Sequence, residues 1–160
     1  MKPGVRVWIV VAVLFVLHFF LHLGLGVGRA APDLLTVALL VLAREVGVGT
    51  AAGVGLFFGL LEDALSVLSF GANGVAMTVI GGLGAATRDL FVGDSLLFLV
   101  SYFVAGKLLR DFIHWIVMGE VIRQPFMDQV VVQGFLGGIY AAAVGILVMV
   151  FLGLWREAPR

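Results

Sequence analysis

Residues 46–63 read VGVGTAAGVGLFFGLLED, an uncharged run of 16 residues followed by two acidic ones. Five of the 16 are glycines, and four of these form the spacings Gly49-x3-Gly53 and Gly55-x3-Gly59. Small residues four apart let two helix backbones approach closely. In lipid, where the hydrophobic effect does not drive helices together, this close van der Waals packing holds them in contact. The uncharged run therefore predicts a membrane-spanning helix in the middle of a helix bundle.

The composition of the whole chain extends this interpretation to all 160 residues. Hydrophobic residues make up 62% and charged residues 12% of the chain, whereas a soluble domain carries about 25% charged residues. So little polar surface excludes an ordinary soluble protein, a disordered chain and a nucleic-acid binder with a basic face. Because one span needs about 20 residues, we expect one transmembrane domain, 1–160, with at most about six helices. The chain has no cysteine, which excludes disulfides and thiolate chemistry.

The predicted fold is an all-α integral membrane protein, a six-helix transmembrane bundle. Its boundaries follow the apolar runs and the charged, glycine and proline residues between them. The first run is longer than the roughly 7–15-residue core of a signal peptide, so we expect it to remain as a span. The six predicted helices are 7–28, 34–43, 46–61, 75–91, 95–114 and 130–154.

Residues 34–61 allow two interpretations. Arg44 and Glu45 interrupt the apolar run after ten residues, which alone would reach about 15 Å, half of the hydrocarbon core. The segment is either one long bent helix with a buried ion pair or a hairpin of two short helices. We favour the hairpin, since an ion pair at bilayer depth is costly and glycines loosen the backbone directly after the pair. Ahead of the segment, Pro32 ends the preceding helix and Asp33 is placed to cap the next one.

Six crossings place both termini on the same side of the membrane, and the basic residues indicate which side. Lysine and arginine concentrate in cytoplasmic loops. The predicted topology puts six of them on the side of the termini and four opposite, which favours cytoplasmic termini. The six are Lys2, Arg6, Arg44, Arg88, Arg156 and Arg160, and the four are Arg29, Lys107, Arg110 and Arg123.

Ionisable residues within or next to the predicted spans are the candidates for chemistry. His18 and His22 are four apart and share one helix face. A zinc ion needs three or four ligands, so we interpret both as polar residues that face the bundle interior rather than as a metal site. Glu62 and Asp63 would form a proton or cation site if they lay inside the membrane. We instead expect them at the water interface, about one membrane thickness from the start of their helix.

A second group of charges, Lys107, Arg110, Asp111 and His114, lies in the second half of the predicted helix 95–114. The group is either a headgroup or partner site or the solvated end of a helix, and we expect the solvated end. The chain contains no Gly-x-Ser-x-Gly, His-Glu-x-x-His or Walker motif. We therefore expect no enzyme, no catalytic or metal-binding residue and no cofactor.

Three short motifs add to these physical arguments. They are Pro32-Asp33-Leu34-Leu35, Gly59-Leu60-Leu61-Glu62-Asp63-x-x-Ser66 and Gly71-x-Asn73-Gly74-x-Ala76. In order and spacing they resemble the MreD family of rod shape-determining proteins, and the resemblance covers residues 32–86. The positions that carry it are Pro32, Asp33, Gly59, Asp63, Gly71 and Asn73.

The resemblance implies a multi-pass protein of the bacterial inner membrane that works in cell-wall elongation in rod-shaped cells. Its main partner would be MreC, a single-span protein with a periplasmic coiled coil. The wider assembly would include the MreB filament and a wall glycosyltransferase and transpeptidase. The family is also similar in fold to the S components of energy-coupling-factor vitamin transporters, which implies a six-helix bundle with a pocket open to the outer face.

We therefore expect a non-enzymatic scaffold that maintains rod shape by binding MreC and linking it to the wall synthases. Its glycine faces, with Gly55 and Gly59 foremost, would seat the transmembrane helix of MreC by close packing. The candidates for helix packing or partner contact are Gly49, Gly53, Gly55, Gly59, Gly134 and Gly138. The alternative is a vitamin-binding S component. Its pocket would need convergent polar side chains, and the chain has only 12 Ser, Thr, Asn and Gln residues.

Overall fold

A computed structural model describes residues 3–24, 33–65, 70–88, 96–120 and 123–153 of the chain. Within these ranges all regular structure is helical, which confirms the predicted all-α class. The elements are α1 (Pro3–Phe19), the π-helix η1 (Phe20–Gly24), α2 (Leu34–Ala43), α3 (Val48–Ala64), α4 (Ala72–Thr87), α5 (Leu96–Val117), the π-helix η3 (Met127–Gln133) and α6 (Gly134–Leu152).

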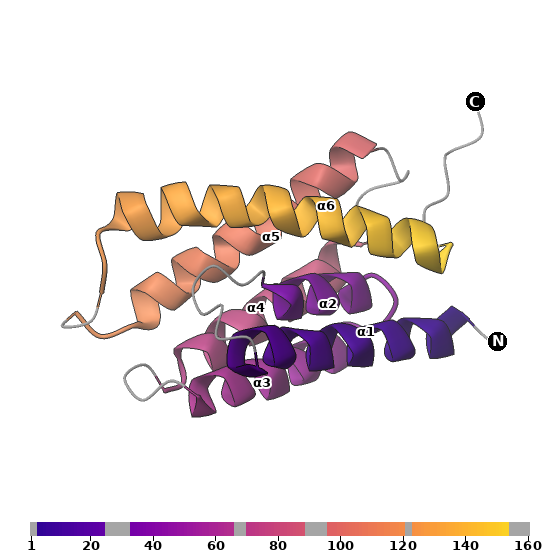
Figure 1. Ribbon diagram of the computed structural model, residues 1–160, viewed down its shortest axis with the longest axis horizontal. Coiled ribbons are helices and arrows are strands. Elements are labelled where there is room, and N and C mark those ends of the chain that lie inside the picture. Colours follow the sequence, from indigo (N-terminus) through magenta and orange to yellow (C-terminus); the bar gives the residue numbers. More distant parts are fainter. Residues whose placement is uncertain (1–2, 25–32, 66–69, 89–95, 121–122, 154–160) are drawn as a thin grey trace.

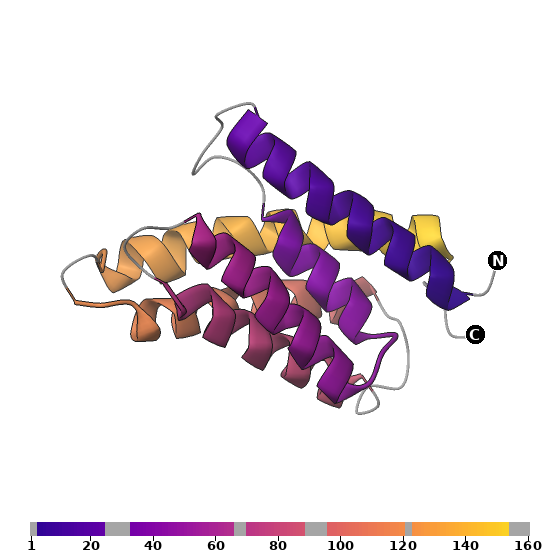
Figure 2. The same ribbon diagram turned by 90° about the horizontal axis from the view of Figure 1, so that it is seen from below.

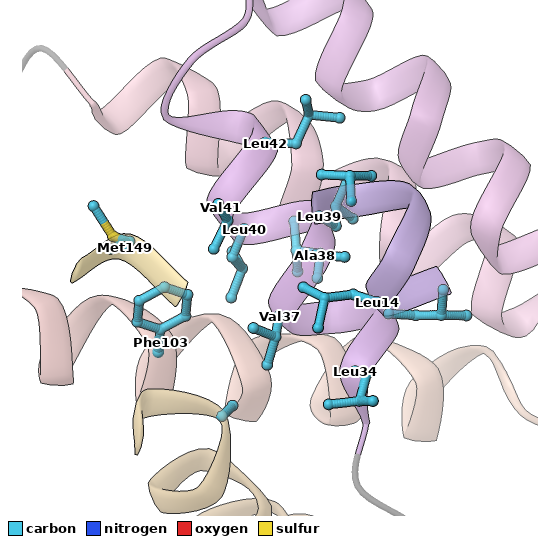
Figure 3. Close-up of a cluster of buried hydrophobic side chains, with 14 of the residues drawn as sticks. Leu14, Leu34, Val37, Ala38, Leu39, Leu40, Val41, Leu42, Phe103 and Met149 are labelled. Atoms are coloured by element: carbon cyan, nitrogen blue, oxygen red, sulfur yellow. The ribbon is translucent and has the colours of Figure 1, made fainter. Parts of the chain in front are cut away.

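The short helix α2 forms the centre of the bundle. Its ten residues are apolar on every side apart from Thr36, and all ten are buried, as expected of a helix that is hydrophobic all round. It contacts α1, α3, α4, α5 and α6, and Figures 1 and 2 show it enclosed between them. Leu14 of α1, Phe103 of α5 and Met149 of α6 belong to the hydrophobic cluster around it (Figure 3).

Helices α2 and α3 form the hairpin that we predicted for residues 34–61. Arg44 and Glu45 lie in the turn, where the amide of Glu45 donates to the carbonyl of Leu42. Gly47 then adopts an extended conformation and begins α3. At the other end of α2, the carboxylate of Asp33 accepts from the amide of Thr36, which confirms its predicted role as N-cap.

Helices α3 and α4 pack backbone against backbone through glycine. A Cβ atom added at Gly55 would collide with the carbonyl of Met77, and one added at Gly59 would collide with the carbonyl of Asn73. Neither contact ends on a flexible side chain that could move aside. Gly55 and Gly59 therefore belong to an internal helix contact, and our expectation that they seat a partner's helix is wrong.

The other glycine candidates divide between the interior and the surface. A Cβ at Gly134 would lie 3.2 Å from Oδ2 of Asp111, and one at Gly138 would lie 3.3 Å from the Cα of Val104, so both serve the α5–α6 contact. Around Gly49 and Gly53, by contrast, no such atom lies within 4 Å. Of the six candidates, only these two lie on the outer surface of the bundle.

Several helix ends differ from their predicted positions. The predicted helix 75–91 begins at Ala72, because Gly71 takes the left-handed conformation (φ 95°) from which α4 starts. The predicted 7–28 begins at Pro3 and becomes a π-helix at Phe20. The predicted 130–154 likewise begins as a π-helix at Met127. Its α-helical part ends at Leu152, next to left-handed Gly153. Hydrophobicity alone does not encode these caps and π-turns. The remaining predicted spans, 46–61 and 95–114, correspond to α3 and α5.

One helical stretch in the described residues is long and apolar enough to cross a membrane. It is Met127–Leu152, 26 residues that combine η3 and α6. Three shorter apolar helices accompany it, Gly4–Phe19, Leu34–Ala43 and Ala72–Thr87.

Candidate functional site

Polar side chains from four helices and from the residue ahead of α2 meet inside the bundle. They gather where α2 and α4 begin and α3 ends, on the side of the α5–α6 connection (Figure 1). We call this group the ion network. Its members are His18, Asp33, Glu62, Asp63, Asn73, Lys107, Arg110 and Asp111.

Arg110 of α5 is the hub of the ion network. Its Nη2 donates to Oε2 of Glu62 at 2.7 Å and to Oδ1 of Asn73 at 2.7 Å. Its Nη1 lies 3.4 Å from Oδ2 of Asp33 and 3.2 Å from Oδ1 of Asp111. The planar guanidinium presents five donors in a fixed fork, so this one side chain connects α5 to α3, to α4 and to the start of α2.

Lys107, one helical turn before Arg110, forms a second connection. Its Nζ lies 2.6 Å from Oδ2 of Asp111 and 3.4 Å from Oδ2 of Asp33. Lys107 is 7% exposed and Asp111 is 9% exposed. A buried charge is costly unless it is paired and hydrogen-bonded, and the pairing at i and i+4 meets that requirement within one helix.

Two of the carboxylates also cap helices. Asp33 accepts from the amide of Thr36 at 3.0 Å and from its hydroxyl at 2.6 Å. Asp63 accepts from the amides of Asn73 and Gly74, at 3.1 and 2.9 Å, and so caps α4 from the end of α3. Burial raises the pKa of Asp33, but the nearby charges of Arg110 and Lys107 outweigh it and hold the pKa well below its usual range.

The negative charge of the ion network is compensated by amides at helix N-termini as well as by basic side chains. The network holds four carboxylates and the two cations Lys107 and Arg110, which leaves two acids in excess. The cations contact three of the carboxylates, and the fourth, Asp63, is bonded to backbone amides. Asp33 and Asp63 both lie at helix N-termini, where unpaired amides carry partial positive charge. Glu62 additionally lies 3.5 Å from Nε2 of His18, which ties α1 to the network. The ion network therefore fixes five segments to one another, namely α1, the start of α2, α3, α4 and α5.

The ion network brings together the residues that carry the sequence resemblance. Asp33 and Asn73 both contact Arg110, and Asp63 accepts the amide of Asn73. Gly59 packs directly against Asn73, and Gly71 sets the turn ahead of it. Of the other predicted positions, Pro32 and the side chain of His22 lie outside the described residues.

Our expectation that Lys107, Arg110 and Asp111 form a solvated helix end is wrong. All three point into the bundle, with side chains only 9–12% exposed. Asp63 is fully buried as well, so its side chain does not face water, although it lies at the end of its helix as expected. The sequence alone does not separate this arrangement from a solvated helix end, because Asp33 and Glu62, which pair with Lys107 and Arg110, lie on other segments. The hint that the sequence offers is that these basic residues lie on a helix that is apolar on both sides of them.

Comparison with protein-family models, with curated proteins and with solved structures gives no match. The contacts of the ion network and the surfaces of the bundle are thus the observations that bear on function. Both oxygens of Asp63 are engaged by backbone amides, which is the geometry of a structural cap.

Replacing Asp63 by alanine should destabilise the fold by about 1–2 kcal/mol, because the first amides of α4 lose their cap inside the bundle. Thermal unfolding of the purified protein measures the loss. Asp128→Ala is the matched control, since Asp128 is exposed in η3 and its loss should change stability by less than about 0.5 kcal/mol. Equal stability of the two variants would contradict the capping role.

Proposed function

We propose that the chain is a multi-pass protein of the bacterial inner membrane and a non-enzymatic scaffold of the cell-wall elongation machinery, with MreC as its partner. The outer surface supports a membrane location. Large apolar side chains are exposed along both α1 and α6, and such extensive apolar surface is unfavourable in water. They include Trp8, Ile9, Val13 and Val16 of α1 and Leu136, Ile139, Leu147 and Phe151 of α6.

The observation that carries the proposal is the convergence of the three motifs in the ion network. The three segments that resemble the MreD family are separate in sequence. One guanidinium, that of Arg110, contacts all of them, at Asp33, Glu62 and Asn73. Asp63, in the second segment, caps α4. The resemblance thus has a shared physical basis. It falls on residues that fix how α2, α3, α4 and α5 are arranged.

The same network supports cytoplasmic termini. Lys107 and Arg110 are enclosed in the bundle, and the rule for basic residues counts those in loops. Removing these two from the four on the far side leaves Arg29 and Arg123, and removing Arg6, which lies within α1, from the six leaves five on the side of the termini. The imbalance favours termini in the cytoplasm more strongly than the sequence count did.

The surface of α3 supports a contact with another helix. Gly49 and Gly53 are open, and Leu56 and Leu60, at the next steps along the same face, are 44% and 39% exposed. Residues at i, i+4, i+7 and i+11 share one helix face. Two glycines at one end let a helix backbone approach, so this face is where the proposal places the transmembrane helix of MreC.

Gly53→Leu is expected to reduce co-purification of MreC at least about tenfold, because the leucine would hold the two helices apart. The experiment expresses both proteins together and measures recovery of MreC with the tagged chain in detergent. Ala143→Leu is the control, since Ala143 is an exposed small residue on α6 and the change there should leave recovery unaltered.

Two results would contradict the proposal. If the wild-type chain does not retain MreC, the partner is wrong. If Gly53→Leu and Ala143→Leu retain it equally, the α3 face is wrong. The alternative, a vitamin-binding S component, would need convergent polar groups to hold its ligand. The polar side chains of the ion network are instead bonded to one another, so the scaffold has the better support.

A further inference from the structure

An aromatic cluster lies where α5 ends and the chain leads into η3, at the end of the bundle away from the N-terminus (Figure 1). The ring centroid of Phe126 lies 5.2 Å from that of Trp115 and 6.3 Å from that of Phe112. Arg123 stacks on the same group, with its guanidinium carbon 4.5 Å from the ring centroid of Trp115. We call Phe112, Trp115, Arg123 and Phe126 the rim cluster.

Hydrogen bonds to the backbone hold the polar atoms of the rim cluster. Nε1 of Trp115 donates to the carbonyl of Gln124 at 2.9 Å. Nη2 of Arg123 donates to the carbonyls of Ile116 and Met118 at 2.9 and 2.8 Å, in the region where the last carbonyls of a helix lack intrahelical partners. These bonds fix the positions of the indole and the guanidinium without the help of a partner molecule.

Apolar side chains next to the rim cluster lie on the outer surface. Trp115 is half-buried, Phe126 is 37% exposed, and Met127, which follows it, is 65% exposed. Exposed apolar surface of this extent marks contact with a membrane or with another protein. The acids Glu120 and Asp128 are exposed in the same stretch of chain, so apolar and polar surface meet here. Further exposed apolar residues continue along the helices, namely Phe112, Ile116 and Val117 on α5, Val131 and Val132 on η3, and Phe135 and Leu136 on α6.

The helices that meet at the rim cluster have the length of a membrane span. Helix α5 has 22 residues, or about 33 Å, and the stretch Met127–Leu152 has 26 residues, or about 39 Å. The hydrocarbon core of a bilayer is about 30 Å thick. If both helices cross a membrane, the residues that join them lie at its boundary, which is where tryptophan side chains concentrate.

The other tryptophan that the structure describes supports this interpretation. Trp8 is 44% exposed near the start of α1, and α1 starts at the opposite end of the bundle from the rim cluster (Figure 1). Tryptophan is enriched at both interfaces of a membrane, because its ring is apolar and its N–H is polar. An aromatic side chain toward each end of the bundle is therefore the pattern of a protein that spans a bilayer.

We propose that the rim cluster inserts into the headgroup boundary of one membrane leaflet, the one opposite the N-terminus, with Trp115, Phe126 and Met127 beside the first carbons of the acyl chains. The cluster thereby sets the depth at which the bundle lies. Arg110 precedes Trp115 by five residues, so the ion network lies up to about 7.5 Å deeper, level with hydrocarbon but enclosed by protein. The inference rests on the membrane location proposed above, and not on the binding of MreC.

The fluorescence of Trp115 in lipid vesicles tests the proposal. The double variant Trp8→Phe/Trp155→Phe leaves Trp115 as the only tryptophan of the full chain. The vesicles contain phosphatidylcholine that carries a nitroxide either near the glycerol end or near the methyl end of its acyl chains. We expect the first lipid to quench Trp115 at least about twofold more than the second, because an indole at the interface lies beside the first carbons of the chains.

Tyr140→Trp, in a chain whose three native tryptophans are replaced by phenylalanine, is the matched control. Tyr140 is 43% exposed on α6 and lies about 20 Å beyond Met127 along the helix, near the middle of the predicted span. The order of the two lipids should therefore be reversed, since the methyl ends of the acyl chains meet at the centre of the bilayer. This variant shows that the two nitroxides report on depth.

Three results for Trp115 would overturn the inference: stronger quenching by the methyl-end lipid, equal quenching by both lipids, or quenching by neither. In the last case, quenching by aqueous iodide would identify the rim cluster as a surface in water, as a contact with another protein requires. If the double variant does not fold, Met127→Cys provides the same readout in the otherwise native chain. The chain has no other cysteine, so a fluorophore attached there reports on the exposed edge of the cluster alone.

The outcomes separate this inference from the proposals on which it rests. A wild-type chain that does not enter vesicles refutes the membrane location, and the inference with it. A chain that enters them but shows the wrong order of quenching refutes the rim cluster alone. Recovery of MreC is measured on a different face of the bundle, on α3, and its failure leaves the depth of Trp115 unchanged.

Discussion

Replacing Arg110 by methionine is expected to destabilise the protein by about 3–5 kcal/mol, because it leaves buried carboxylates without a partner. The change leaves Glu62 and Asp111 without their shared partner and removes the donor to Asn73. Methionine keeps much of the length and apolar bulk of arginine, so the loss reports on charge rather than on packing. Unfolding in detergent with increasing denaturant measures the effect.

Arg6→Met provides the matched control for Arg110→Met. Arg6 is exposed on α1, and its replacement should change the free energy of unfolding by less than about 0.5 kcal/mol. Arg110→Lys should fall between the two, because an ammonium keeps the charge but lacks the fork that serves several acceptors at once. If Arg110→Met unfolds at the same denaturant concentration as Arg6→Met, the ion network does not hold the helices together.

Gly59→Ala is expected to cost about 2–3 kcal/mol, although it adds only one methyl group. The new Cβ would overlap the backbone of Asn73 and Gly74, and two helices must separate to accommodate it. Overpacking of this kind typically costs 1–3 kcal/mol. The backbone of α4 cannot move aside as the tip of a side chain would, which places the effect at the upper end of that range.

Gly53→Ala, on the same helix, should have the opposite sign. No atom from outside its own stretch of helix lies within 4 Å of the position of its Cβ, and alanine favours the helix over glycine by up to about 1 kcal/mol. The pair therefore separates close packing from helix propensity within α3. Thermal unfolding of both variants gives the comparison, and a stabilised Gly59→Ala would refute the backbone contact between α3 and α4.

Local sequence signals predicted a large part of this fold. A run of ten residues between Asp33 and Arg44, apolar apart from Thr36, predicted a short helix with an N-cap, and the charged pair at 44–45 predicted the turn that follows. These features depend on neighbouring residues, whose preferences can be assessed directly. The same holds for the all-α class, which follows from composition and from long apolar runs.

The candidate site depended on contacts that no local pattern contains. Arg110 reaches Glu62 across 48 positions of sequence and Asn73 across 37, so its burial became visible only with the helices in place. The glycines show a related limit. Their spacing on α3 predicted close packing, but it did not show which glycines pack inside the bundle. Gly53 faces outward, whereas Gly55, two residues later, faces α4.

The full enclosure of α2 has a consequence for biogenesis. This helix spans ten residues and contacts α5 and α6, which the ribosome produces after it. In the membrane location proposed above, a helix of about 15 Å is too short to cross a bilayer by itself, and Asp33 at its start acquires its cationic partners only with α5. The enclosure of α2 is therefore complete only after the C-terminal half of the chain has been synthesised.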